Sequence, residues 1–485
     1  MPILIKNAYI VTGDNENNIF EKGDIVINDN HIEYVGVSKD HRLDFDKVID
    51  GSNRMLIPGL INAHTHTHAT ISKGVLERDF HALFMWKNMA ATALRTPEEL
   101  YYTTLASCIE LVRGGTTCIL DHFPEQPFTK EMVDAAAKAF EDFGMRTVLA
   151  LRIYDGEYSD IIPQNIGQLP DELRELIDIS PLRAPETKEV LDLTAWAIEK
   201  WHRAKGLLSV IPGPSAPLRC SDDLLIGANE LAKKYNLGVH THLLESSVQA
   251  EISQNRYGKS LVAHMDDLGV LNSRLSCAHT IWVTDDDIRL LAERGVSVVH
   301  NPTSNLRLGA GFSPILKMKE AGVNIAIATD GACSNDNVRM LEALKMAAII
   351  HRPFEKNRQL WLSAEDVLYG ATRAGAKVCN LEDRVGSLEK GKEADISIFS
   401  MDSLAFKPLD DPLRQLIYAA NYQEAETVII NGKIIMENGN FLNLDEKEII
   451  NRANEAAERV KQDNKKWFDF AERITPYLVK EQVKK

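Results

Sequence analysis

From residue 55 onward, short apolar runs alternate with longer stretches of helical periodicity, and this alternation constrains the fold more than any other feature of the sequence. Eight strand–helix units fit a (β/α)8 barrel, an α/β fold whose strands are all parallel. An open doubly wound sheet is the alternative, but it needs a Gly-rich phosphate loop after an early strand, and none has the right spacing. The apolar runs are Met55–Ile61, Thr116–Leu120, Arg146–Leu151, Leu207–Ile211, Leu237–His242, Leu275–His279, Val296–His300 and Val323–Thr329.

Helical periodicity fills most of the intervals between these runs. One interval, Tyr154–Pro185, is instead rich in Pro, Asp and Glu and follows the third run. Loops at the carboxyl ends of barrel strands build the active site, so this segment either covers the pocket or is a surface insertion. The expected helices are Pro97–Arg113, Lys130–Phe143, Glu186–Ala204, Asp222–Tyr235, Thr284–Arg294 and Val338–Ile350.

The two ends of the chain carry strand patterns of their own. Before residue 55, alternating runs separated by turn clusters predict a small antiparallel sheet. After the barrel, a predicted amphipathic helix over Ala364–Cys379 precedes further strands, with a hairpin turn at Asn431-Gly432. Strands at both ends need partners to bury their apolar faces. The expected strands are Ile3–Val11, Asp24–Ile27, His31–Val37, Lys47–Ile49, Ile396–Phe399, Thr427–Ile430 and Lys433–Met436.

These patterns divide the chain into four parts. We expect residues 1–54 and 384–445 to form one shared β-sandwich, because neither set of strands can bury its apolar face alone. Residues 55–383 form the barrel, and residues 446–485 form a charged helical tail packed on the outside.

Charge and cysteine content argue against several classes of protein. The chain has 55 Lys and Arg against 70 Asp and Glu, a net charge of −15, which argues against a nucleic-acid partner. Six cysteines without paired spacing indicate a reduced cytoplasmic protein without a disulfide framework. The first residues do not have the layout of a signal peptide, and no apolar run is long enough for a membrane span, so no membrane partner is expected.

Metal-binding side chains follow four of the predicted barrel strands. His64 and His66 stand two residues apart, so they point to the same side of an extended strand. His242, His279 and Asp330 stand at the ends of the fifth, sixth and eighth runs. In a barrel these strand ends meet on one rim, and imidazole is the commonest metal ligand. The coincidence predicts a metal site on that rim.

With these residues in place, the sequence resembles the amidohydrolase superfamily, in its cytosine-deaminase-like branch of mononuclear deaminases and chlorohydrolases. The resemblance covers nearly the whole chain and implies a (β/α)8 barrel with a β-sandwich from both chain ends. At the family level it also allows a homo-oligomer, a dimer or a tetramer. It rests on residues 58–66 (PGLINAHTH), His242 with Glu245, Ala278-His279, residues 301–305 (NPTSN), residues 329–335 (TDGACSN) and residues 386–395.

The resemblance implies one divalent metal ion per chain, zinc in the first place and iron as the alternative. Its ligands are the residues that match the family's motifs: His64, His66, His242 and Asp330. Two-metal members add a bridging carboxylated lysine on the fourth strand. Residues 207–213 contain no lysine, which favours a single metal.

The resemblance also implies the chemistry. A divalent ion lowers the pKa of water toward 7, which supplies hydroxide for attack on a ring carbon that bears an amine. Glu245, three residues after His242, corresponds to the glutamate that is not a ligand in zinc deaminases and shuttles the proton. His279 orients the hydroxide and polarises the substrate, and Asp330 takes the second proton for the departing ammonia.

The family does not fix the substrate, since one barrel hosts many chemistries. Methylthioadenosine/S-adenosylhomocysteine deaminases share the metal motifs, but their ribose-reading glutamate falls at Thr92 and a substrate histidine falls at Ser215. We therefore expect a free amino-substituted purine, pterin, pyrimidine or triazine as the small-molecule substrate. The alternatives are a methylthioadenosine/S-adenosylhomocysteine deaminase and a triazine chlorohydrolase or alkylamine hydrolase. A non-enzymatic scaffold is disfavoured because Glu245 and the ligands are intact. The candidate substrate contacts are Trp86, His122, Asn305 and Ser334.

Overall fold

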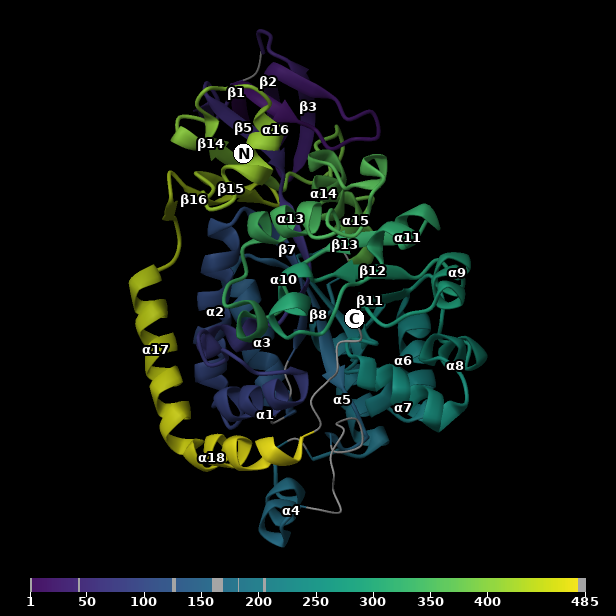
Figure 1. Cartoon of the computed structure of the whole chain (residues 1–485). Helices are drawn as coiled ribbons and strands as arrows, with labels where there is room; N and C mark the ends of the chain where they lie inside the picture. Colours follow the sequence, from purple (N-terminus) through teal and green to yellow (C-terminus); the bar gives the residue numbers. More distant parts are fainter. Residues whose placement is uncertain are drawn as a thin grey trace.

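The computed structural model of the chain describes residues 2–41, 44–123, 128–158, 169–181, 183–203 and 206–478. Within these residues, eight strands form two parallel four-stranded sheets that close into a barrel, which confirms the predicted fold (Figure 1). One backbone hydrogen bond joins His242 N to Ser215 O (3.3 Å) at one seam, and another joins Asp330 N to His64 O (3.1 Å) at the other. The barrel strands are β6 (Leu60–Thr65), β7 (Thr116–Phe123), β8 (Arg146–Ile153), β9 (Leu208–Pro214), β10 (Val239–Leu243), β11 (Leu275–His279), β12 (Ser297–His300) and β13 (Asn324–Ile327).

The apolar run predicted as one strand, Met55–Ile61, is divided between two sheets. β5 (Arg54–Pro58) belongs to the sheet built from the chain ends, and β6 belongs to the barrel. The two strands meet at Gly59, where an added Cβ atom would lie 2.1 Å from Thr117 Oγ1 of β7. A residue without a side chain is therefore needed where the chain passes from one sheet to the other.

The helices cover the outside of the barrel (Figure 1). Three have the predicted bounds, and three others are shorter than predicted by one to three residues at each end, where helices fray. None of the helices in the described residues is both long enough and apolar enough to cross a membrane. The helices at predicted positions are α2 (Pro97–Arg113), α3 (Lys130–Phe143), α5 (Thr187–Trp201), α6 (Asp222–Tyr235), α9 (Asp285–Glu293) and α13 (Met340–Ile349).

The prediction of a single helix over Ala364–Cys379 was wrong. It is divided into α14 (Ala364–Gly370) and α15 (Arg373–Val378). The carbonyl of Ala371 accepts a hydrogen bond from Ile61 N (2.7 Å) of β6 in place of an amide of its own helix. A contact with the barrel thus interrupts the helix, and a single-helix pattern in the sequence gives no sign of it.

The segment between the third barrel strand and α5 is only partly described, because residues 159–168 and 182 lie outside the described ranges. Its described part includes the short helix α4 (Asp171–Asp178). Other helices between the strands are α1 (His81–Thr92), α7 (Ser247–Tyr257), α8 (Leu261–Asp267), α10 (Pro302–Arg307), α11 (Ile315–Glu320), α12 (Ala332–Asn335) and α16 (Pro412–Tyr418), and the 3-10 turns include η1 (Thr67–Ser72) and η4 (Pro217–Arg219).

Strands from both chain ends form one nine-stranded sheet within the described residues (top of Figure 1). The two ends meet where β5 pairs antiparallel with β14, with Ile57 opposite Ser397. The predicted antiparallel pairing is found for β1–β2–β3, whereas β4 and β5 run parallel to β1. Ile5, Ile27 and Ile398 share one apolar core. The further strands are β1 (Ile3–Val11), β2 (Ile19–Asn28), β3 (His31–Val37), β4 (Lys47–Asp50), β14 (Ile396–Ser400), β15 (Thr427–Ile430), β16 (Lys433–Glu437) and β17 (Asn440–Phe441).

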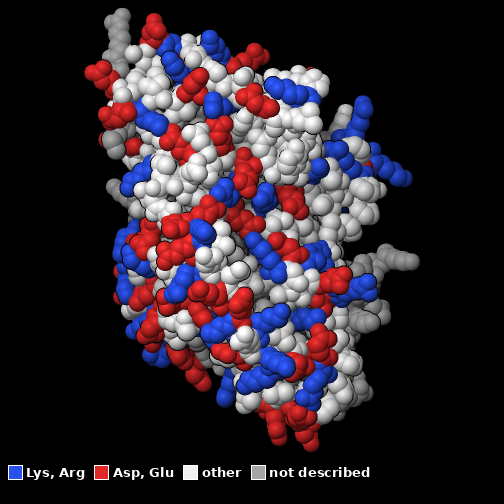
Figure 2. All heavy atoms as spheres, turned by 90° about the vertical axis from the view of Figure 1, so that its left-hand side faces the viewer, with Lys and Arg blue, Asp and Glu red and all other residues white. Residues whose placement is uncertain are grey.

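Two helices of the C-terminal tail, α17 (Glu446–Asp463) and α18 (Lys465–Ile474), run along one side and across the lower end of the barrel (Figure 1). Arg459 Nη2 contacts Glu99 Oε2 of α2 at 2.6 Å, which ties α17 to the barrel's outer helices. Acidic and basic side chains are intermixed over this face (Figure 2). Residues 479–485 of the predicted helical tail lie outside the described ranges.

Candidate active site

Three imidazoles and one carboxylate converge at the carboxyl end of the barrel. His64 lies near the end of β6, His66 follows that strand, His242 lies in β10, and Asp330 follows β13. The Nε2 atoms of His64 and His66 lie 3.5 and 3.4 Å from Asp330 Oδ1. The Nε2 atom of His242 lies 3.3 Å from that of His66. All four side chains are buried.

This arrangement fits a tetrahedrally coordinated divalent metal. Ligand bonds of about 2.0–2.2 Å place neighbouring ligand atoms of a tetrahedron roughly 3.3–3.6 Å apart. The three distances above agree with that spacing. The Nε2 atom of His64 is buried and has no hydrogen-bond partner among the described residues. Ligand atoms of His122 with His64 and His242, and of His279 with His64 and Asp330, also lie within 4.8 Å of one another.

The Nδ1 atom of each of the three histidines contacts a residue outside the four candidate ligands. Each Nε2 atom therefore faces the position that a metal ion would occupy. His66 Nδ1 donates to the carbonyl of His122 (2.7 Å), and His242 Nδ1 donates to the carbonyl of Ser215 (2.6 Å). His64 Nδ1 lies 2.8 Å from His240 Nε2. Burial lowers the pKa of His66 to about 3, so this imidazole is neutral at physiological pH. Partners of this kind fix the tautomer and orientation of a metal-binding imidazole.

Asp330 is held by neighbouring hydroxyls in an unusual backbone conformation. Ser304 Oγ and Ser334 Oγ donate to its Oδ2 at 2.7 and 2.8 Å. Its φ of 64° is left-handed, a conformation uncommon outside glycine and concentrated at functional sites. Burial alone would raise its pKa, but the His64 and His66 imidazoles outweigh burial and hold the pKa of this carboxyl well below its usual range. Asp330 is therefore an anion facing the three imidazoles.

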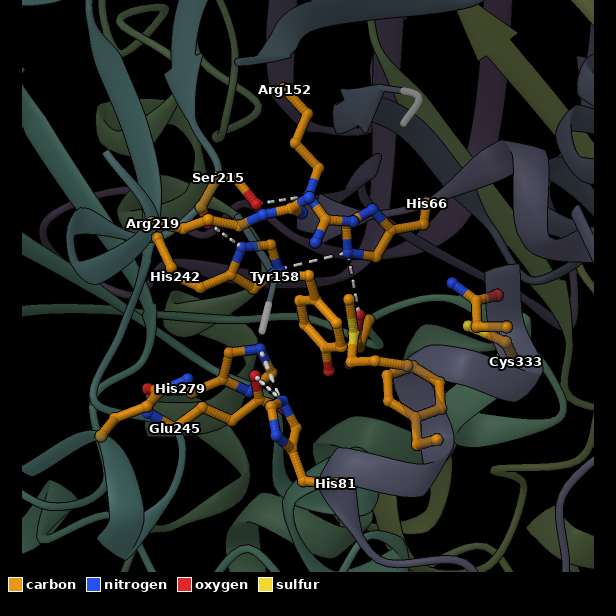
Figure 3. A pocket seen from close by; sticks show the side chains of 16 residues that line it. His66, His81, Arg152, Tyr158, Ser215, Arg219, His242, Glu245, His279 and Cys333 are labelled. Atoms are coloured by element: carbon orange, nitrogen blue, oxygen red, sulfur yellow. Dashed lines mark hydrogen bonds and ion pairs between the residues drawn. The ribbon is translucent and has the colours of Figure 1, made fainter. Parts of the chain in front are cut away.

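A second carboxylate, Glu245, stands beside this cluster. His81 Nε2 donates to its Oε2 (3.1 Å), and His279 Nε2 lies 3.8 Å from its Oε1 (Figure 3). Burial raises the pKa of Glu245, but the His279 and His81 imidazoles outweigh burial and bring that pKa to about 2. His279 Nδ1 donates to Asn305 Oδ1 (2.8 Å), which turns its Nε2 toward Glu245. Glu245 is thus ionised and able to accept a proton.

These groups open onto a cavity with an empty volume of about 570 Å³, part of it open to solvent. The wall is mixed, with apolar side chains from α1 and polar groups from the strand ends (Figure 3). It is lined by His66, His81, Phe84, Met85, Asn88, Arg152, Tyr158, Ser215, Ala216, Arg219, His242, Glu245, Gln249, His279, Asp330 and Cys333.

The four side chains predicted to contact substrate lie behind this wall, outside the described lining. Trp86 is fully buried, with its ring edge-on to the rings of Tyr158 and Phe470. Asn305 bonds to His279, and Ser334 bonds to Asp330, as given above. The remaining one, His122, donates from Nε2 to the carbonyl of Gly213 (3.0 Å). Each of the four therefore contacts a residue that lines the cavity. For Trp86 this residue is Tyr158, and for His122 it is His66, whose Nδ1 donates to the His122 carbonyl.

Three basic lining residues were not identified from the sequence. His81 is on α1 and does not follow a barrel strand in the sequence, so the strand-end rule could not find it. Arg219 is on the turn η4. Arg152 lies one residue beyond the predicted third strand, Arg146–Leu151, because β8 continues to Ile153. Extending that strand would have identified Arg152 by the same rule that identified the histidines.

Comparisons with known proteins agree on one family. Residues 55–435 match the amidohydrolase family. The chain is 34% identical to the 5'-deoxyadenosine deaminase of Methanosarcina mazei over 94% of this chain and 98% of the other. It is also 34% identical to the 5-methylthioadenosine/S-adenosylhomocysteine deaminase of Thermoanaerobacter pseudethanolicus, over 93% and 97%. A solved structure of atrazine chlorohydrolase from Arthrobacter aurescens complexed with zinc has a TM-score of 0.84 and 26% identity, over 94% and 100%.

Proposed function

Because this chain belongs to the amidohydrolase family, we propose that it is a metal-dependent hydrolytic deaminase that releases ammonia from an amino-substituted nitrogen heterocycle. The observation that carries this proposal is the convergence of three imidazoles and one carboxylate beside the ionised Glu245. Asp330 Oδ1 lies 3.5 and 3.4 Å from the Nε2 atoms of His64 and His66, and His242 Nε2 lies 3.3 Å from His66 Nε2. His64, His66, His242 and Asp330 would hold one divalent ion, for which zinc is our first choice because it accepts this N3O set tetrahedrally. β9 contains no lysine, which supports a single metal.

The residues around the cluster supply the proton transfers. A divalent ion in this position lowers the pKa of water toward neutrality and so provides a nucleophile. Glu245 accepts a proton from the attacking water and delivers it to the ring nitrogen next to the attacked carbon. His279 is held by Asn305 with its Nε2 3.8 Å from Glu245 Oε1, and it would orient the attacking hydroxide and polarise the substrate. Asp330 takes the second proton that the departing ammonia needs.

A free heterocycle is favoured over a nucleoside. Thr92 stands where the related nucleoside deaminases place a ribose-reading glutamate, and its hydroxyl donates to the carbonyl of Asn88 (2.7 Å) within α1. Ser215, which replaces their substrate histidine, lines the cavity and accepts from Arg152 Nε (2.9 Å). A methylthioadenosine/S-adenosylhomocysteine deaminase is the second candidate, because a relative that is 34% identical carries that name. A chlorohydrolase is the third, since the same attack displaces chloride and the zinc-containing structural relative carries that name. The free cysteines support a cytoplasmic location.

The test combines metal analysis with ammonia release. The purified protein should contain one zinc or iron per chain, and ammonia release from at least one aminated purine, pterin, pyrimidine or triazine should stop with a chelator and return with metal. His242→Ala should lose metal and activity together. His122→Asn, a matched change just outside the proposed ligand set, should keep its metal. Two metals per chain, or chelator-resistant turnover, would refute the proposal.

A further inference from the structure

One carboxamide in the wall of the cavity has no hydrogen-bond partner. Asn88, on α1, is 4% exposed and lines the cavity. Its Oδ1 atom is buried without a partner, and its Nδ2 atom makes no hydrogen bond within the described residues. A buried polar group without a hydrogen bond destabilises a folded protein, and most such groups are paired. The Asn88 amide therefore calls for a functional explanation.

Other polar side chains of the described lining have partners in the protein. The second carboxamide, Gln249, accepts a hydrogen bond at Oε1 from the backbone N of Glu245 (2.8 Å). The hydroxyl of Ser215 accepts from Arg152 Nε (2.9 Å). The fold provides these groups with partners but provides none to the Asn88 amide, so a partner for this amide must come from the contents of the cavity.

Asn88 stands at a defined distance from the proton-transfer end of the cavity. His81, whose Nε2 donates to Glu245 Oε2 (3.1 Å), belongs to the same helix (Figure 3). Seven positions separate His81 from Asn88, so the two residues lie on one face of α1, two turns and about 10 Å apart along its axis. Phe84 and Met85 lie between them on the helix and also line the cavity. Along this face, α1 presents a group tied to Glu245, then an apolar surface, then an unpartnered amide.

This spacing limits the length of a substrate that contacts both ends. Hydrogen bonds of about 2.9 Å at each end leave roughly 4–5 Å of the axial distance for the ring system between them. The ring atoms of one six-membered ring do not span that length, whereas those of two fused rings do. The apolar surface between the two ends suits the flat face of such a ring system.

We propose that Asn88 is a specificity-determining residue that hydrogen-bonds to a ring nitrogen at the far end of a fused bicyclic substrate. This inference rests on the deaminase function proposed above and narrows its substrate class to amino-substituted fused heterocycles, of the purine or pterin type. The ring nitrogen that Asn88 binds is remote from the amino group that leaves. The last torsion of an Asn side chain is roughly two-fold, so the amide can present its NH2 group to a ring acceptor or its oxygen to a ring N–H. A single-ring amine bound at Glu245 does not bring a ring nitrogen to Asn88.

The first arm of the test compares probes on the wild-type, metal-loaded protein. Adenine is set against 4-aminopyrimidine, and guanine and pterin against isocytosine, so that the members of each pair differ by the second ring. Deaza analogues, 7-deaza and 9-deaza for the purines and 5-deaza and 8-deaza for pterin, keep the fused shape and replace one distal nitrogen by carbon. We expect at least one fused amine to have a kcat/KM about tenfold or more above that of its single-ring counterpart. One of its deaza analogues should lose about five- to tenfold, the scale of one hydrogen bond.

The second arm uses Asn88→Leu, which keeps the approximate size of the side chain and removes the amide. The preference for the fused amine over its deaza analogue should disappear, while the kcat/KM of the analogue changes little. Because the native amide is buried without a partner, the variant should unfold at the same or a higher temperature. Asn229→Leu on α6 is the matched control. Its Oδ1 accepts from Asn272 Nδ2 (3.0 Å), so its replacement should not raise the unfolding temperature and should keep the preference.

Several outcomes would overturn the inference. These are equal kcat/KM for fused and single-ring amines, no loss with either deaza analogue in the wild type, and a preference that survives unchanged in Asn88→Leu. A lower unfolding temperature of Asn88→Leu with an unchanged preference would assign Asn88 to packing alone. The wild-type comparison decides even if Asn88→Leu does not fold.

A binding measurement separates this inference from the proposed function. Adenine, guanine, pterin and their deaza analogues are titrated by calorimetry into the zinc-loaded Glu245→Gln variant, with and without Asn88→Leu, so that turnover is not needed. Tighter binding of a fused amine than of its deaza analogue, lost on Asn88→Leu, supports the inference even if no probe releases ammonia, a result that would sink the deaminase proposal alone. Ammonia release with equal binding of fused amine and deaza analogue would leave the deaminase standing and remove the role of Asn88.

Discussion

At the scale of single residues, Glu245 is the group on which the proposed chemistry depends. It is buried beside the four candidate metal ligands but is not one of them, and His81 and His279 keep it ionised. Glu245→Gln keeps the size and shape of the side chain but cannot accept a proton. We predict a normal metal content and thermal unfolding temperature, with kcat lower by at least about 10²-fold, the scale of a lost general acid or base. Near wild-type turnover in Glu245→Gln would show that the proton moves by another route.

His81 is a positioning residue for Glu245, and its effect should be visible in a pH profile. Its imidazole donates to Glu245 Oε2 and is one of the groups that lower the pKa of that carboxyl. His81→Gln keeps a donor but removes the titratable charge, so the pKa of Glu245 should rise. Because the base must be ionised, the acid limb of kcat/KM should move to higher pH, while the plateau falls by no more than about tenfold. A lower plateau with an unmoved acid limb would mean that His81 serves packing alone.

The candidate ligands could be selected from the sequence because a parallel barrel brings its strand ends to one rim. His64, His66, His242 and Asp330 needed only that rule to be placed together. His81 could not be found this way, since it lies 164 residues from Glu245 on a helix whose position on the rim depends on packing. Strand-end position also could not separate residues that line the cavity from those one layer behind it, such as His122 and Asn305.

At the scale of elements, α1 forms an apolar wall of the cavity and rests on the C-terminal tail. Its inner side presents Phe84, Met85 and Asn88 to the cavity. Trp86, also on α1, is buried with its ring 5.1 Å from that of Phe470 in α18. The charged periodicity of the tail predicted a helix on the outside of the barrel. The buried side of α18 packs against α1, the helix that carries His81. The predicted pattern gave the position of the tail but not this contact.

Phe470→Ala should therefore lower stability and activity together. Removing a buried aromatic side chain costs about 3–5 kcal/mol, and the space left beside Trp86 loosens α1. We predict a lower unfolding temperature and a reduced kcat/KM on the best substrate found. Asp469→Ala, an exposed neighbour on α18, is the control and should change neither. If kcat/KM in Phe470→Ala is unchanged at a temperature where the protein is folded, α18 does not support the site.

At the scale of the whole molecule, the barrel and the sheet of the chain ends are joined through a buried ion pair. Arg146, at the start of β8, donates from Nε and Nη2 to Asp395 just before β14, at 2.8 and 2.9 Å. Asp395 also accepts from Asn431 N (2.8 Å), and Glu393 lies 2.8 Å from the same guanidinium. Burial lowers the pKa of Arg146, but Asp395 outweighs burial, and the pKa is raised above its usual value. Segments 249 residues apart thus meet in one charged contact.

Removing one partner of this pair should destabilise the protein more than removing the charges of both. Arg146→Met leaves the buried Asp395 without its cation and should lower the free energy of unfolding by about 3–5 kcal/mol. In the double variant, Asp395→Asn removes the stranded charge but keeps an oxygen for Asn431 N–H, so part of that loss should return. Urea unfolding of the two single variants and the double variant gives the coupling energy, with Arg414→Met, a surface arginine whose side chain is 66% exposed, as the control. Additive losses in the double variant would mean that the two parts of the fold are joined by apolar packing and backbone pairing, and not by this ion pair.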